Sequence, residues 1–241
     1  MEHKQYIFGD RLDFNSAEEF KKLRTNVLFS IPGDKKCTVI GLTSSMPSEG
    51  KTSTAINLAY TFAEAGKKTL LIECDLRLPT MAKKIGLPRT KGLSDILISD
   101  SNKISSIIQS TLSDNLHILT SGSIPPNPTE LLGSERMVSV MDALKEGYDY
   151  IFLDLPPITV VADAVVVSKV LDGIVFVARE DYVSKKAFAD SIRQLRFANV
   201  KILGIVTVCS KESNKGKYYK YKKDSSHYDY GYANKRRANM K

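Results

Sequence analysis

The segment "TVIGLTSSMPSEGKTSTAINLA" at residues 38–59 decides the fold of this chain. It begins with a short apolar, β-branched run (38–43), passes through a polar loop, and continues as an amphipathic stretch from residue 51. Such a run predicts a buried strand, and the amphipathic stretch predicts a helix. The order strand, loop, helix indicates an α/β unit whose loop lies at the carboxyl end of a parallel strand, where ligands bind.

The loop itself resembles a phosphate-binding motif. Residues 45–52 match G-x-x-x-x-G-K-[ST], with Ser45 in the first glycine position, where serine still fits a tight turn. We expect Lys51 to reach the β- and γ-phosphate oxygens of a bound nucleotide, and the Thr52 hydroxyl to ligate Mg²⁺. The backbone N–H groups of Ser48, Glu49 and Gly50 are expected to bind the phosphates, helped by the helix dipole. Ser45 and Ser53 are the remaining expected nucleotide-binding residues. The alternative is a chance GKT at a helix start, which the strand and helix around it disfavour.

A second acidic segment supplies a partner for the metal. The run "YIFLDL" (150–155) places Asp154 at the end of an apolar stretch, and two prolines follow it. A carboxylate there is costly to bury without a role, and phosphate-loop proteins need one for magnesium. We expect Asp154 to be that ligand, with an ordinary strand-end aspartate as the alternative.

A third segment, "KKTLLIECDLRLP" (67–79), carries Glu73, Asp75 and Arg77 at alternate positions. Alternate residues of an extended chain face the same side, so all three are expected to point at one site. Two acids beside magnesium would orient the ion, with Asp75 as a ligand, and one would accept a proton from an attacking hydroxyl. The alternative is a salt-bridged surface edge.

The rest of the chain repeats the same alternation. Strands are predicted at 69–74, 116–121, 150–155, 173–178 and 201–208, and helices at 51–66, 134–147 and 184–199. A first helix is expected from about Ser16, where Glu19 completes a capping box. We therefore expect an α/β fold: a mostly parallel sheet flanked by helices, as in P-loop NTPases.

Composition bounds the class of protein. The 241-residue chain has no apparent signal peptide, and its most apolar region (162–178) contains Lys169 and Asp172. A spanning helix needs about 20 apolar residues, so we expect an intracellular, soluble chain. Three cysteines without a CxxC pair, Cys37, Cys74 and Cys209, make a disulfide framework or zinc site an unlikely interpretation.

The positive charge lies in the C-terminal tail. From residue 211 onward there are ten basic and three acidic residues, so the tail carries +7 of the net +8. A basic nucleic-acid-binding face on the folded body is therefore not supported. The tail has no hydrophobic periodicity and contains six tyrosines within 15 residues, Tyr218, Tyr219, Tyr221, Tyr228, Tyr230 and Tyr232. Tyrosines among lysines are also compatible with base stacking or with an anionic lipid surface, two alternatives that stay open.

Taken together, these motifs resemble the bacterial tyrosine kinases of capsule and exopolysaccharide operons. "SSMPSEGKT" is similar to the family's Walker A, "LLIECDLRLP" to its Walker A′, "FLDLPP" to its Walker B and "SGSIPPNPTELLGSER" to a segment after its fourth strand region. The tyrosine-rich end resembles its autophosphorylated cluster. Glu18, Lys21 and Arg24 resemble its N-terminal E-x-x-R-x-x-R element of self-assembly.

The resemblance implies an ATP- and Mg²⁺-dependent protein-tyrosine kinase that phosphorylates its own tail in a neighbouring subunit. It also implies a ring-like homo-oligomer, with an octamer as one candidate. A membrane-anchored polysaccharide co-polymerase would activate the cytoplasmic chain at the inner face of the membrane, and a cognate tyrosine phosphatase would oppose it. The expected parts are a self-assembly segment (1–36), a kinase domain (37–209) and a flexible basic tail (210–241).

Three residues depart from the family pattern. Lys21 replaces the first arginine, which keeps the charge but loses bidentate geometry. Glu73 replaces the usual aspartate, which leaves open whether Glu73 or Asp75 is the base. Val208 stands where members often carry asparagine near the nucleotide base, so backbone groups are expected to contribute to adenine selection.

A positioning ATPase of the MinD/ParA type is the main alternative function. Those proteins share the fold but carry a lysine directly after the first motif position, where this chain has Met46. They also lack a tyrosine cluster of this density. Met46 and the tail therefore favour the kinase over the positioning ATPase.

Overall fold

The segment that decides the fold forms β1 (Thr38–Ser44), a loop and α2 (Lys51–Glu64), as its hydrophobic pattern predicts. The computed structural model describes residues 12–31, 35–88, 90–99 and 104–208. The tail tyrosines and Cys209 lie outside these described residues. All described residues belong to a single structural unit that ends at Val208.

Seven strands form one sheet in the order β3-β4-β2-β5-β1-β6-β7. The strands other than β1 are β2 (Thr69–Glu73), β3 (Gln109–Ser110), β4 (Leu116–Leu119), β5 (Tyr150–Asp154), β6 (Gly173–Arg179) and β7 (Ile202–Val208). All neighbouring pairs are parallel except β3 with β4, which are antiparallel. The expected mostly parallel α/β sheet is confirmed.

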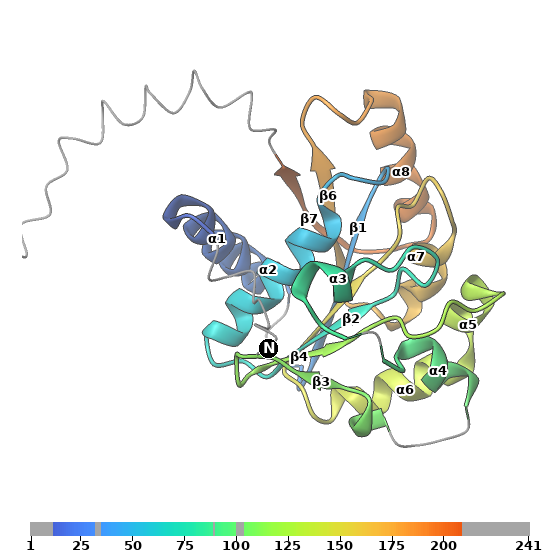
Figure 1. The fold of residues 1–241 in the computed structure, drawn as a ribbon. Helices are drawn as coiled ribbons and strands as arrows, with labels where there is room; N and C mark the ends of the chain where they lie inside the picture. Colours follow the sequence, from blue (N-terminus) through green and yellow to red (C-terminus); the bar gives the residue numbers. More distant parts are fainter. Residues whose placement is uncertain (1–11, 32–34, 89, 100–103, 209–241) are drawn as a thin grey trace, which may run out of the picture. The chain divides into compact units, whose positions relative to one another are not determined.

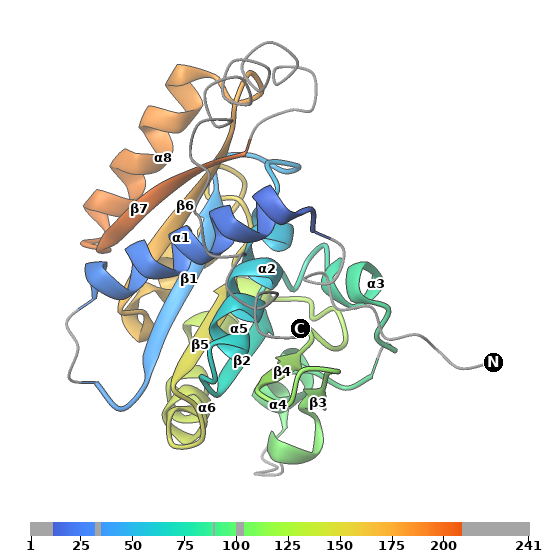
Figure 2. The same cartoon turned by 90° about the vertical axis from the view of Figure 1, so that its left-hand side faces the viewer.

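Helices cover both faces of the sheet, as Figures 1 and 2 show. Each face of the sheet forms an apolar core with the helices that cover it. The core on one face includes α1 (Phe14–Ser30), α2 and α3 (Met81–Ile85). The core on the other face includes α4 (Leu93–Ile98), α5 (Pro128–Gly133), α6 (Glu135–Lys145), α7 (Asp163–Val166) and α8 (Lys185–Phe197). Two 3₁₀ segments, η2 (Ile104–Ser106) and η3 (Val167–Val170), complete the described elements. Alternate residues of β1 divide between the cores: Ile40 packs toward α2, and Val39 packs toward α6 and α8. Because both faces are buried, the strands read as continuous apolar runs.

The strand register brings three segments of the sequence together at one edge. Leu42 of β1 pairs with Asp154 of β5, and Glu73 of β2 pairs with the same residue from the other side. The carboxyl ends of β1, β2 and β5 are therefore adjacent, and the loops that follow them surround one space.

Most long elements agree with the sequence prediction, but the start of the first helix does not. Its N-cap is Asp13, whose carboxylate accepts a hydrogen bond from the Ser16 backbone N–H at 2.9 Å. The expected cap at Ser16 is wrong because an aspartate three residues earlier satisfies the same kind of free N–H. The short elements α3, α4, α5, α7 and β3 were not anticipated.

The first turn of α4 contains a carboxylate, Asp95, that links the start of the helix to the loop after β4. Asp95 accepts a hydrogen bond from the Gly92 N–H at 2.8 Å, and its other oxygen accepts one from the Ser123 hydroxyl at 2.9 Å. This arrangement satisfies donors at the helix start and joins it to the loop after β4.

Two observations bear on the class of protein. Within the described part of the chain, no helix is both long and apolar enough to cross a bilayer. Cys37 and Cys74 are buried free thiols, and burial raises the pKa of Cys37 to about 11. They contribute to the apolar core.

Candidate active site

The loop between β1 and α2 has a backbone suited to anion binding. Gly50, the N-cap of α2, has a φ of 91°, a left-handed conformation that glycine adopts without strain. Ser48 also has a positive φ of 66°. Such a turn directs successive N–H groups toward one point at the helix N-terminus, where phosphate binds.

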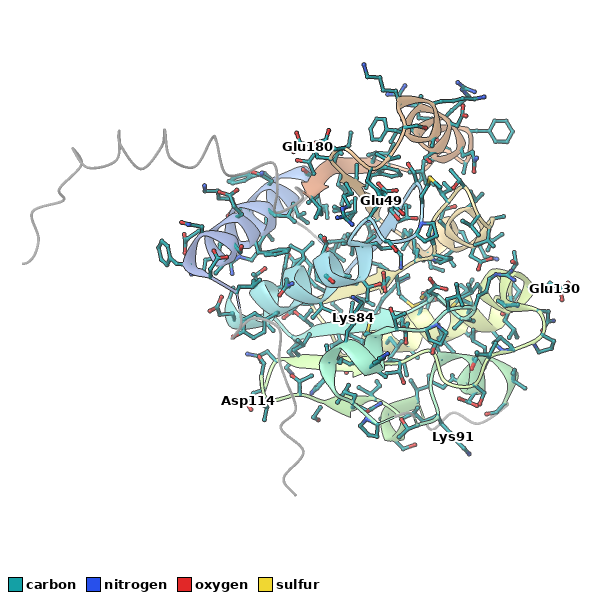
Figure 3. The ribbon with its side chains drawn as sticks, turned by 45° about the horizontal axis from the view of Figure 1, so that its top comes forward. Glu49, Lys84, Lys91, Asp114, Glu130 and Glu180 are labelled. Carbon is teal, nitrogen blue, oxygen red and sulfur yellow. The ribbon has the colours of Figure 1, made fainter. Side chains whose placement is uncertain are left out.

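A buried glutamate, Glu49, holds the backbone of this loop in place. The Glu49 side chain is 1% exposed, and its two oxygens accept hydrogen bonds from the backbone N–H groups of Met46 at 2.6 Å and Arg179 at 3.0 Å. It therefore joins the loop to the end of β6, at the residue labelled Glu49 in Figure 3. The phosphate-loop motif predicts a backbone contact at Glu49 and gives no sign of this side-chain role, because the N–H of Arg179 is 130 residues away in the sequence.

Lys51 lies between two carboxylates. Its Nζ is 2.8 Å from Asp154 Oδ1 and 3.8 Å from Asp75 Oδ2. Asp154 is only 1% exposed, so a cation beside it is required to compensate its charge. Burial raises the pKa of Asp75, and the positive charge of Lys51 opposes that rise.

A cavity of about 340 Å³ opens beside this group. Its lining combines loop residues with residues that follow β2: Ser48, Gly50, Lys51, Thr52, Asp75 and Arg77. Ser53 and Lys84 also line it, and Lys84 Nζ lies 3.4 Å from the Ser53 hydroxyl. The volume falls in the range of small-molecule sites. Lys84, labelled on α3 in Figure 3, is a third cation that the sequence analysis did not select.

The donor set fits a magnesium nucleotide. Backbone amides and Lys51 suit phosphate, and the Thr52 hydroxyl with the Asp75 and Asp154 carboxylates supplies hard oxygen ligands. No cluster of three acidic, histidine or cysteine side chains able to hold a metal occurs among the described residues. Magnesium in nucleotide sites needs no such cluster, since it keeps waters and substrate phosphates as ligands.

Ser45 occupies the first glycine position but does not line the cavity. It is fully buried, and its carbonyl accepts hydrogen bonds from the N–H and hydroxyl of Thr159, at 3.3 and 2.5 Å. Its hydroxyl has no partner within the described residues. Ser45 therefore joins the phosphate loop to the segment after β5.

Glu73 does not share the cavity with Asp75 and Arg77, contrary to the expectation. One of its oxygens accepts hydrogen bonds from the N–H groups of Thr80 at 2.6 Å and Met81 at 2.7 Å, and the other accepts from Ser121 at 3.3 Å. Burial raises the pKa of Glu73, and these three hydrogen bonds oppose the rise. The reason is that β2 ends at Glu73, so the alternation of an extended strand does not continue to residues 75 and 77.

Arg77 is held by two residues that the sequence analysis missed. Its Nη2 donates to the Thr129 hydroxyl at 2.8 Å, and its Nε lies 3.4 Å from Asp163 Oδ2. Asp163 is fully buried. A single acid inside the apolar stretch "VVADAVVVS" was the available signal for such a site.

The residues that were expected to contribute to self-assembly lie on α1. Lys21 forms an ion pair with Glu18 at 2.9 Å, and Arg24 donates to the Thr61 carbonyl of α2 at 2.5 Å. Arg24 thus joins α1 to the sheet-covering helix within the same chain. Val208 packs beside Gly50, where an added Cβ would come within 3.4 Å of its side chain.

The fold and this cavity define the chain as a P-loop nucleotide-binding protein. A family model described as an AAA domain matches residues 38–198. Tyrosine-protein kinase YwqD of Bacillus subtilis (strain 168) is 37% identical over 217 residues, covering 90% of this chain and 86% of that protein.

Solved structures lead to the same family. The kinase domain of Escherichia coli tyrosine kinase ETK has a TM-score of 0.75 and 29% identity, covering 81% of this chain and 76% of that chain. The chimerical protein CapA2B2 has a TM-score of 0.74 and 35% identity, covering 79% and 83%. MinD from Pyrococcus horikoshii, complexed with Mg-ADP, shares the fold alone, at a TM-score of 0.60 and 23% identity over 71% of this chain and 70% of that chain. The chain belongs to the bacterial tyrosine kinase family.

Proposed function

We propose that this chain transfers the γ-phosphoryl group of ATP to protein tyrosines, including Tyr218, Tyr219, Tyr221, Tyr228, Tyr230 and Tyr232 of a second copy. The single observation that carries the proposal is the grouping of Lys51, Asp75 and Asp154 beside a cavity of about 340 Å³. Relatives that are named tyrosine-protein kinases match this chain over most of their length, which supports tyrosine as the acceptor.

The residues divide the work as follows. Amides of the phosphate loop bind the phosphates, Lys51 holds the β- and γ-phosphate oxygens, and Thr52, Asp154 and Asp75 are the residues that would hold magnesium. Bound magnesium supplies charge neutralisation at the β- and γ-phosphates. Arg77 reaches the same cavity and stabilises negative charge there during transfer.

Asp75, rather than Glu73, is the proposed base. Asp75 lines the cavity, and its Oδ1 already accepts a hydrogen bond from the Leu78 N–H at 3.1 Å. Its Oδ2, which lies 3.8 Å from Lys51 Nζ, is the oxygen that would take the phenol proton. A bond forms between the phenolic oxygen and the γ-phosphorus, the bond from that phosphorus to the bridging oxygen breaks, and ADP leaves. Glu73 already accepts three backbone hydrogen bonds away from the cavity.

The same family membership supports a proposal for the assembly. We propose a ring-like homo-oligomer, with an octamer as one candidate and α1 at its contacts through Glu18, Lys21 and Arg24. A membrane-anchored polysaccharide co-polymerase would recruit the chain to the inner face of the membrane and activate it. The kinase would regulate capsular or exopolysaccharide synthesis and chain length, and a cognate tyrosine phosphatase would remove the phosphates that it adds. Nucleic acid is not a proposed ligand.

The experiment is incubation with Mg-ATP, alone and with a co-polymerase cytoplasmic peptide, followed by intact mass and anti-phosphotyrosine detection. Mass gains of one phosphate each, confined to 218–232 and absent in Lys51→Met, support the proposal. ATP hydrolysis without any phosphotyrosine under either condition would overturn it in favour of a MinD/ParA-like positioning ATPase.

A further inference from the structure

Arg77 is joined to two segments that lie far from it in the sequence. Thr129 is in α5, the helix marked by its neighbour Glu130 in Figure 3, and Asp163 is the first residue of α7. Thr129 accepts from Arg77 Nη2 at 2.8 Å and donates its own proton to Asp163 Oδ1 at 2.5 Å. Asp163 Oδ2 faces Arg77 Nε at 3.4 Å, so the three side chains form a closed ring of contacts.

The burial of Asp163 makes this ring stable in one arrangement. Its side chain is 0% exposed, whereas that of Arg77 is 39% exposed. A buried carboxylate needs a cation and hydrogen-bond donors, so Asp163 strongly favours the conformation in which Arg77 reaches it. Thr129 fixes the remaining freedom, because its hydroxyl serves both partners at once.

The ring leaves the rest of the guanidinium at the cavity. Arg77 lines the same cavity as Lys51 and Asp75, although one edge of it contacts Thr129 and Asp163. No hydrogen bond of its Nη1 to another described residue is found. Fixing a free arginine side chain costs rotamer entropy, and anchoring one edge of Arg77 removes much of that cost before substrate binds.

We propose that Thr129 and Asp163 are positioning residues that hold Arg77 at the mouth of the phosphate cavity for transfer. The inference rests on the proposed kinase function, because it deepens the role of Arg77 there. The two residues act through Arg77 and do not themselves contact the phosphates.

The first test uses the nucleotide-free protein. The Arg77 Nε–Hε signal in a ¹H–¹⁵N spectrum, assigned by its loss in Arg77→Lys, should be sharp and slow to exchange with water. Thr129→Val, which keeps the shape and removes the hydroxyl, should broaden this signal and speed its exchange at least fivefold. Thr111→Val removes a hydroxyl of comparable burial near β3 and should leave the signal unchanged. An unchanged signal in Thr129→Val would overturn the proposal.

The second test is a double-mutant cycle in activity. Thr129→Val should lower kcat about 5- to 20-fold with KM for ATP within twofold, and Thr129→Ser should restore the wild-type rate. In an Arg77→Ala background Thr129→Val should have no further effect, because it acts through Arg77. Additive losses, or a wild-type kcat in folded Thr129→Val, would refute the positioning role. Asp163→Asn, checked for folding by thermal melting, gives an independent second cycle.

The two proposals fail in different ways. If wild type forms no phosphotyrosine, the kinase proposal fails. The positioning role is then still decided by the Nε–Hε signal and by the Thr129→Val and Arg77→Ala double-mutant cycle measured as the rate of ADP formation. If wild type forms phosphotyrosine and Thr129→Val does not change the signal or the rate, only the positioning role fails.

Discussion

Replacing Glu49 with glutamine tests whether the phosphate loop is organised before nucleotide binds. The Glu49 carboxylate accepts from two backbone N–H groups, those of Met46 and Arg179, at 2.6 and 3.0 Å. Glutamine has the same shape but only one acceptor oxygen, so its NH₂ group faces one of these donors. That donor is left without a partner in a site where the side chain is 1% exposed.

The expected magnitude follows from that single lost hydrogen bond. A buried donor without a partner costs about 1–3 kcal/mol. The loop has to keep Ser48 at a φ of 66° and Gly50 at 91° in order to present its amides. The same free energy should therefore weaken ADP binding by about 5- to 150-fold, at 1.4 kcal/mol per factor of ten.

Isothermal titration of Mg-ADP into Glu49→Gln and wild type measures this change directly. Glu146→Gln is the matched control, since its side chain is 73% exposed and, among the described residues, pairs only with Lys36 at the surface. Such pairs contribute about 0–1 kcal/mol, and the control lies away from the loop. An ADP affinity of Glu49→Gln within twofold of wild type would refute the idea that this carboxylate holds the loop.

Three further expectations concern stability and the packing of α1. Lys51→Met removes the cation 2.8 Å from buried Asp154, so urea titration should show that the free energy of unfolding falls by about 3–5 kcal/mol. Adding Asp154→Asn should restore most of this loss, and an unchanged free energy of unfolding in Lys51→Met would contradict the pairing. Burial raises the pKa of Asp95, but hydrogen bonds at the start of α4 outweigh it and hold the pKa below its usual value. Its stabilisation is thus present above the unfolded pKa of about 3.9 and lost as pH falls through the folded-state pKa. Asp95→Asn should therefore destabilise the protein by about 1 kcal/mol at pH 7 and by progressively less as the pH falls below about 3.9. A loss that does not depend on pH would exclude the assignment. Arg24→Gln should speed hydrogen exchange across α1 by removing its bond to the Thr61 carbonyl, and unchanged exchange would show that α1 is held by its apolar contacts alone.

The sequence by itself determined the fold class and the location of the site. Local patterns suffice for both, because a buried parallel strand reads as an apolar run and a phosphate loop needs a Gly-Lys-Thr at a helix start. Asp154 could be placed for the same reason, since a parallel strand that ends in a carboxylate delivers it to the edge where the loop lies. The C-terminal tyrosines were visible in sequence, and their role stays a prediction.

Only the tertiary structure decided which way the acidic side chains point. The alternation of an extended strand predicted that Glu73 and Asp75 point in the same direction, but β2 ends at Glu73. Backbone N–H groups of α3 and of the loop after β4 donate hydrogen bonds to the Glu73 carboxylate and hold it away from the cavity. Thr129 and Asp163 reach Arg77 across separations of 52 and 86 residues. Such contacts depend on how whole elements pack, and no local periodicity carries that information. The sequence therefore specifies where the phosphate cavity forms, and long-range packing specifies which side chains reach it.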